Sequence, residues 1–94
     1  MKSSLSTNCA VSKTATLLSD TWTMLIIRDL LKTKMRFCEL ERSLVGISTR
    51  TLTNKLKRLE SEEVVVKADD VHYMLTPTGK KLKKVIDAME AWGR

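Results

Sequence analysis

A short turn containing glycine, set between two amphipathic segments, constrains this chain more than any other feature of its sequence. The pattern predicts a helix over 37–43, a tight turn over 44–47 and a second helix over about 48–62. Gly46 suits the turn because a residue without a Cβ atom adopts positive φ at little cost. Ser48 suits the start of the second helix, since its hydroxyl can accept from backbone N–H groups of the first turn. The stretch is therefore predicted to be a helix-turn-helix.

The second predicted helix has two different faces. Leu52, Leu56 and Leu59 recur at spacings of four and three, so they share one apolar face that can anchor the helix to a core. At about 100° per residue, cationic, amide and hydroxyl side chains gather roughly opposite. Such groups reach phosphate oxygens and base edges in a DNA major groove. A polar helix face can also be merely solvated, so the helix alone leaves both interpretations open.

Most of the predicted DNA-binding residues have one of two roles. Base edges would be read by Arg50, Thr51 and Asn54, and phosphates would be held mainly by Lys55, Lys57 and Arg58. The remaining predicted contacts come from Ser48 and Thr49 at the helix start and from Lys67 on the strand that follows.

Length and charge narrow the class of protein. The chain has 94 residues, which indicates one domain over residues 1–94. Its 17 basic and 11 acidic side chains give a formal charge of +6, which favours an anionic partner, although the distribution of charge decides more than the total. The longest apolar run, 24–27, is too short to span a bilayer, and the first ten residues lack the apolar run of a secretory signal. We therefore expect a cytoplasmic protein with no membrane partner.

The sequence offers no pattern that indicates catalysis or metal binding. Cys9, Cys38 and His72 are scattered and lack the spacing of a zinc site, and two cysteines are too few for a disulfide scaffold. No glycine-rich phosphate loop and no Ser/His/Asp constellation can be recognised. We therefore predict no catalytic residues, no metal and no cofactor, and we do not expect an enzyme.

Two helices are predicted ahead of the helix-turn-helix. The first spans 9–19 and carries a narrow apolar stripe, and Cys9 would lie in its first turn, where the helix dipole favours a thiolate. Asp20 is a suitable N-cap for the second, over 21–32, which is apolar nearly all round and so belongs at the centre of a domain. Residues 33–36 break the helical pattern and are a candidate for a short edge strand. The stripe of the first helix consists of Val11, Ala15 and Leu18.

The pattern changes from helical to strand-like after residue 62. Segments 64–67 and 71–75, with a tight turn at Asp69-Asp70 between them, predict a β-hairpin. Thr76 followed by proline then predicts the start of a last helix over 77–92. This helix has a broad apolar stripe. Together with the first helix it leaves more apolar surface than so small a core can cover, which favours a dimer interface.

The predicted order of elements is that of a winged helix-turn-helix: mainly α with a small β-hairpin, in the order α-α-α-α-β-β-α. The sequence resembles the HxlR-type bacterial transcriptional regulators, which are relatives of the MarR group. The matching positions run through nearly the whole chain in the right order. They are Cys9, Trp22-Thr23, Leu25-Ile26, Arg28-Asp29-Leu30-Leu31, Arg36-Phe37, Glu39-Leu40, Gly46-Ile47-Ser48, Arg50-Thr51-Leu52, Leu56, Leu59-Glu60, Tyr73, Leu75-Thr76, Gly79 and Trp92-Gly93.

The resemblance implies a homodimer formed through the first and last helices, binding of double-stranded DNA through 48–62 and a role for Cys9 in detecting oxidants or electrophiles. Two departures from the family pattern stand out: Ala10 replaces a frequent proline, and the hairpin loop shrinks to about 68–70. Because two aspartates at the tip should be repelled by phosphate, we expect the wing to add little DNA affinity unless Lys67 reaches the backbone. An unreactive cysteine at a helix start remains the alternative for Cys9.

The sequence is compatible with two functions. The leading hypothesis is a dimeric, sequence-specific DNA-binding transcriptional regulator. The alternative is a winged-helix module for protein–protein interaction, whose basic face meets an acidic protein and which does not bind DNA. The sequence does not disclose the operator, the regulated genes, the effector or the direction of regulation.

Overall fold

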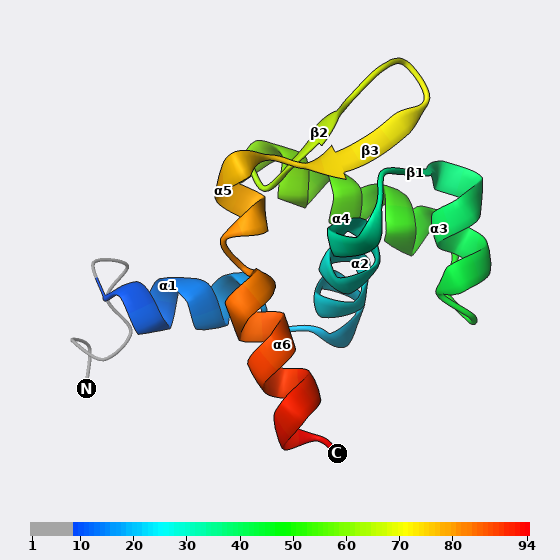
Figure 1. Ribbon diagram of the computed structural model, residues 1–94. Coiled ribbons are helices and arrows are strands. Elements are labelled where there is room, and N and C mark those ends of the chain that lie inside the picture. Colours follow the sequence, from blue (N-terminus) through cyan, green and yellow to red (C-terminus); the bar gives the residue numbers. More distant parts are fainter. Residues whose placement is uncertain (1–8) are drawn as a thin grey trace.

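The computed structural model describes residues 9–94, which fold into six helices and three strands (Figure 1). In chain order the elements are α1 (Ala10–Leu17), α2 (Thr21–Lys32), β1 (Met35–Arg36), α3 (Phe37–Ser43), α4 (Thr49–Ser61), β2 (Val65–Lys67), β3 (His72–Leu75), α5 (Pro77–Lys80) and α6 (Lys83–Trp92). The hairpin β2–β3 lies beside α4, whereas α1 and α6 extend away from the hairpin (Figure 1). The predicted winged helix-turn-helix fold is confirmed.

The core forms where α2, α3 and α4 meet the sheet. Each of these helices contributes side chains with almost no exposed surface, as predicted for the leucine face of α4. Burying such a side chain stabilises the fold by about 1.5–3 kcal/mol, so this core fixes the position of α4. Its members are Ile26, Ile27, Leu30, Leu40, Leu44, Leu52, Leu56, Leu59, Val64, Val65 and Leu75.

The turn between α3 and α4 has the predicted geometry. Gly46 has a φ of 94°, a value that residues with a Cβ atom rarely adopt. The backbone N–H of Ile47 donates to the carbonyl of Leu44 at 3.0 Å and closes the turn. Ser48 is the N-cap of α4, and its side chain accepts from the backbone N–H of Thr51 at 3.0 Å. Local sequence signals therefore determine how α4 starts.

The end of α4 leads directly into the sheet. The N–H of Val64 donates to the carbonyl of Leu59 at 2.9 Å, and the N–H of Glu63 donates to the carbonyl of Glu60 at 3.0 Å. This is the Schellman pattern of helix termination, with Glu63 at a φ of 60° where glycine is commoner. Since Leu59 and Val64 are both buried, the chain stays in contact with the core where it turns from the end of α4 into β2.

The sheet has three antiparallel strands in the order β1-β3-β2 within residues 9–94. Val65 pairs with Leu75 in the predicted hairpin, and Met35 of β1 pairs with Tyr73 on the other edge of β3. The candidate edge strand over 33–36 is thus present, although it is limited to two residues.

The prediction of one continuous helix over 77–92 is wrong. The chain forms α5 and α6, and the backbone N–H groups of Lys81 and Leu82 donate to carbonyls three residues back instead of four. Thr76 anchors α5, because its hydroxyl donates to the Glu63 carbonyl at 2.6 Å and accepts from the Gly79 N–H at 2.9 Å. The break lets α5 stay against residues 63 and 64, which join α4 to β2, while α6 packs against α2.

The first helix is shorter than predicted, and Cys9 is its N-cap instead of a first-turn residue. None of the residues of α1 or α6, all of which the structure describes, is buried. Val11 is 78% exposed on α1, and Trp92 is 90% exposed on α6. Both helices therefore keep apolar surface that the described chain does not cover.

Candidate nucleic-acid interface

The outward side of α4 carries an open row of polar side chains. Arg50, Asn54 and Lys57 are exposed and lie opposite the buried leucines of the same helix, as a rotation of about 100° per residue requires. Within residues 9–94, no hydrogen bond or ion pair engages these three side chains. We call these three residues the open face of α4. A guanidinium, an amide and an ammonium group in a row can meet both phosphates and base edges.

The predicted contacts at the start of α4 also shape the helix-turn-helix itself. Besides capping the helix, the Ser48 hydroxyl donates to Thr51 Oγ1 at 2.9 Å. Thr49 Oγ1 donates to Glu41 Oε2 at 2.6 Å, which ties the start of α4 to α3. These three hydroxyls therefore hold α4 in place, and those of Ser48 and Thr49 belong to exposed residues.

Two of the predicted phosphate ligands lie on a different side of α4 and already have partners in the protein. Lys55 Nζ is 3.2 Å from Asp20 Oδ2, and Arg58 Nη2 donates to the backbone carbonyl of Thr16 at 3.2 Å. Both cations are half-buried. Their partners belong to α1 and to the segment before α2, so Lys55 and Arg58 are not part of the open face.

Asp20 is held firmly in this contact. It caps α2 by accepting from the backbone N–H and the hydroxyl of Thr23, both at 2.8 Å. Partial burial raises the pKa of Asp20, but the hydrogen bonds from Thr23 and the ion pair with Lys55 outweigh it and lower the pKa below its ordinary value. The carboxylate therefore stays ionised beside Lys55 at neutral pH.

A groove of about 930 Å³ separates the side of α4 from the wing. Lys57 borders it on α4, Lys67 borders it on β2 and Arg36 borders it at the start of α3. Lys67 Nζ lies 5.3 Å from the centre of the Tyr73 ring, which orients the ammonium group by a cation–π contact. Three cations around one groove suit a strand of phosphates, although Glu60 and Asp70 also line it.

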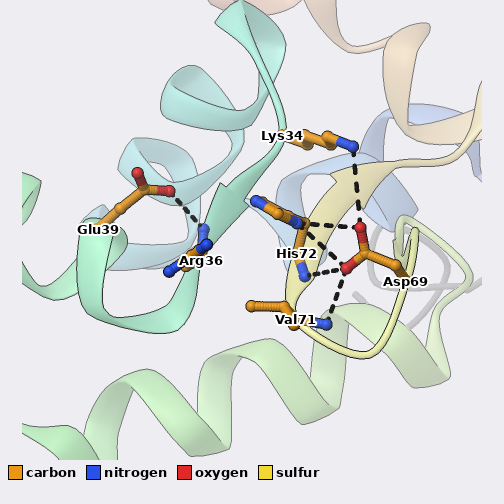
Figure 2. A network of polar contacts seen from close by, with 6 residues as sticks. All are labelled: Lys34, Arg36, Glu39, Asp69, Val71 and His72. Carbon is orange, nitrogen blue, oxygen red and sulfur yellow. Dashed lines mark hydrogen bonds and ion pairs between the residues drawn. The ribbon is translucent and has the colours of Figure 1, made fainter.

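The wing tip is closed by Asp69, as Figure 2 shows. Asp69 Oδ1 accepts from the backbone N–H groups of Val71 and His72, both at 2.8 Å, and His72 Nδ1 lies 3.0 Å from Oδ2. Lys34 Nζ approaches the same carboxylate at 3.8 Å. The hydrogen bonds from the backbone of His72 and Val71 lower the pKa of Asp69 to about 2.

This geometry changes the expectation of repulsion at the tip. The charge of Asp69 is directed at donors of the wing itself and is partly balanced by Lys34. Asp70 is left as the aspartate of the tip that lines the groove. His72 is half-buried in the same cluster. The wing can thus present Lys67 to a phosphate with less electrostatic repulsion than the two aspartates of its tip indicated.

A buried carboxylate, to which the sequence alone assigned no role, links α2 to α3. Asp29 is 4% exposed and accepts from Arg28 Nε at 3.1 Å, from Arg28 Nη2 at 2.9 Å and from Ser43 Oγ at 2.6 Å. A buried carboxylate is tolerated only when it is paired and hydrogen-bonded. Its position inside an otherwise apolar helix was the available signal, because a lone acid there needs such partners.

Both cysteines are free and exposed: Cys9 is the N-cap of α1, and Cys38 lies in the first turn of α3. Cys38 lines the groove, where Arg42 Nη2 is 4.0 Å from its sulfur. No cluster of three or more His, Cys, Asp or Glu side chains within residues 9–94 could hold a metal ion. In the same part of the chain, no helix combines the length and the hydropathy that crossing a bilayer requires.

A helix-turn-helix followed by a β-hairpin, with a third strand on the hairpin's edge, defines a winged helix-turn-helix protein. The family model for the HxlR-like helix-turn-helix matches residues 17–94, so the chain belongs to this family. Several of its relatives are named as transcriptional regulators of the helix-turn-helix type. YvaP of Bacillus subtilis, an uncharacterised regulator of the helix-turn-helix type, is 37% identical over 87 residues, which cover 85% of this chain and 80% of YvaP. The chain is thus a transcriptional regulator of the helix-turn-helix type.

Solved structures agree with this assignment. Quinone-bound YodB from B. subtilis superposes with a TM-score of 0.82 at 35% identity, covering 88% of this chain and 93% of YodB. The redox regulator HypR in its reduced form superposes with a TM-score of 0.83 at 27% identity, covering 90% of each chain.

Proposed function

We propose that this chain acts as one domain, over residues 1–94, in a homodimeric regulator that binds specific sites on double-stranded DNA. The observation that carries the proposal is the open face of α4. Its three side chains are exposed and free of partners among the described residues, whereas the leucines behind them fix the helix in the core. In this arrangement Arg50 and Asn54 read base edges, and Lys57 holds a phosphate.

The groove beside α4 supports the same docking. When α4 enters a major groove, the neighbouring sugar–phosphate backbone must pass between α4 and the wing. Arg36, Lys57 and Lys67 line this passage and supply positive charge on both of its sides. The predicted contribution of Lys67 thus rests on its position across the groove from Lys57.

The dimer is supported by the uncovered helices. The structure describes all of α1 and α6, and neither has a buried residue, although both carry large apolar side chains such as Val11 and Trp92. A twofold dimer joined through these helices would place two copies of α4 about 34 Å apart on one side of the duplex. The expected DNA site is therefore a pseudo-palindrome.

The proposal is tested by selecting bound sequences from a random DNA pool and measuring affinity for the selected duplex. Arg50→Ala should weaken binding by roughly 1–3 kcal/mol and relax the preference for one base. Lys81→Ala removes one positive charge at an exposed position between α5 and α6, outside the open face, the groove and the two helices assigned to the dimer, and is the matched control, which should keep that preference. An equal loss on all DNA sequences would contradict the base-reading role of Arg50. Absence of any retardation of duplex DNA at low salt would favour the alternative, a protein-binding module.

We further propose that the regulator responds to thiol-reactive compounds through Cys9. Its thiol is exposed at the N-cap of α1, one of the two helices assigned to the dimer. The similarity to quinone-bound YodB and to the redox regulator HypR supports this role. Treatment with a benzoquinone should lower the DNA affinity of the wild type and of Cys38→Ser, and it should leave Cys9→Ser unchanged. Equal sensitivity of Cys9→Ser would contradict the proposal.

A further inference from the structure

We propose that Lys55 and Arg58 are positioning residues that fix α4 to the junction of α1 and α2, and that they do not bind phosphate. We call Lys55, Arg58, Asp20 and the carbonyl of Thr16 the junction clamp. The inference rests on the proposed DNA binding by α4, and it assigns these two cations a different task from the one their sequence pattern predicted.

The geometry of the clamp places both cations on one side of α4. Lys55 and Arg58 are three residues apart, which puts them on neighbouring turns of the same helical side. Each reaches its partner at 3.2 Å, and each is half-buried, in contrast to the exposed Lys57. This side is turned away from the groove that Lys57 and Lys67 border.

The partners of the two cations suit permanent contacts. The carbonyl of Thr16 lies in the last turn of α1, where helix carbonyls lack intrahelical donors and the helix dipole favours a cation. Arg58 therefore satisfies a group that would otherwise need water. Asp20 is fixed to α2 by two hydrogen bonds from Thr23. Lys55 therefore pairs with a carboxylate whose position is set by α2.

The clamp connects two parts of the molecule that have different tasks. α1 carries Cys9 and part of the proposed dimer surface, and α4 carries the open face. A shift of α1 relative to the core changes the positions of Thr16 and of the junction, and the two contacts pass this change to α4. Small helix shifts of this kind are a common way in which regulators change DNA affinity.

Asp20→Asn separates the two roles of Lys55, because they predict opposite signs. Asparagine is also a good N-cap, so α2 keeps its start while the ion pair is lost. If Lys55 binds phosphate, freeing it and removing a negative charge should strengthen binding to all DNA. If Lys55 positions α4, the affinity for the selected site should fall relative to random duplex, by roughly two- to fivefold for a pair of this exposure.

The salt dependence of binding gives a second readout. Lys55→Met keeps the apolar stem of the side chain and removes its charge. A positioning role leaves the slope of log K against log salt unchanged, whereas loss of a phosphate contact reduces the slope by about one. The double variant that combines Lys55→Met with Asp20→Asn should lose no more DNA affinity than either single variant, because both substitutions remove the same contact.

Lys57→Met, from the open face, is the matched control and should reduce the slope by about one. A reduced slope for both Lys55→Met and Lys57→Met would overturn the clamp and leave the proposed function intact. A wild type whose DNA binding does not depend on salt would instead contradict the proposed function. Tighter binding of Asp20→Asn to all DNA would also overturn the clamp.

Discussion

Gly79 lies where α5 is pressed against the sheet, and replacing it with alanine should destabilise the fold. A Cβ atom at this position would be 2.2 Å from the carbonyl oxygen of Val64 and 3.2 Å from Cδ2 of Leu75. The Val64 carbonyl cannot simply move aside, because it accepts from the backbone N–H of Thr76 at 3.0 Å. Overpacking of this kind, together with a weakened hydrogen bond, should cost about 2–3 kcal/mol after the lower chain entropy of alanine is counted.

Urea and thermal unfolding followed by circular dichroism measure this loss. For a chain of this size, the predicted cost corresponds to a fall in Tm of roughly 10–20 °C. Gly93→Ala is the matched control, because its Cβ atom would meet nothing closer than 3.4 Å. It should stay within about 0.5 kcal/mol of the wild type. Wild-type stability of Gly79→Ala would refute the close packing of α5 against the backbone at Val64.

Two further predictions concern the wing and the dimer. The pKa of Asp69 is lowered to about 2 from its ordinary value of 3.8. Its carboxylate therefore stabilises the folded wing above about pH 4, and this contribution is lost as the pH falls towards 2. Asp69→Asn should therefore reduce the acid sensitivity of the His72 and Val71 amide signals in that range, and an unchanged titration would contradict this role. Met89→Glu places a charge on the apolar side of α6 and should shift the protein from dimer towards monomer in sedimentation experiments, whereas an unchanged dimer would exclude α6 from the interface.

The helix-turn-helix could be predicted because its signals are local. Gly46 provides the positive φ of the turn, Ser48 provides the cap, and the leucine spacing of α4 identifies its buried face without any knowledge of distant residues. The exposed positions of Arg50 and Asn54 follow from the same periodicity. This part of the fold and of the candidate site therefore needed only residues that are neighbours in the chain.

The remaining features depend on contacts between distant segments. Periodicity places Arg58 near the polar side of α4, but it cannot reveal that Thr16 lies within hydrogen-bonding distance, 42 residues earlier. The break between α5 and α6 accompanies a close approach of Gly79 to Val64, a contact that the apolar stripe over 77–92 cannot reveal. The inward direction of the Asp69 carboxylate likewise depends on the conformation of the loop, not on its composition.

The most direct test of the central claim is an NMR titration of the protein with its selected duplex. If the open face of α4 lies against DNA, the largest changes in backbone and side-chain signals should fall between residues 49 and 57 and at Lys67. The signals of the core leucines should change little. Changes concentrated on α1 and α6, with Arg50, Asn54 and Lys57 unaffected, would contradict the claim.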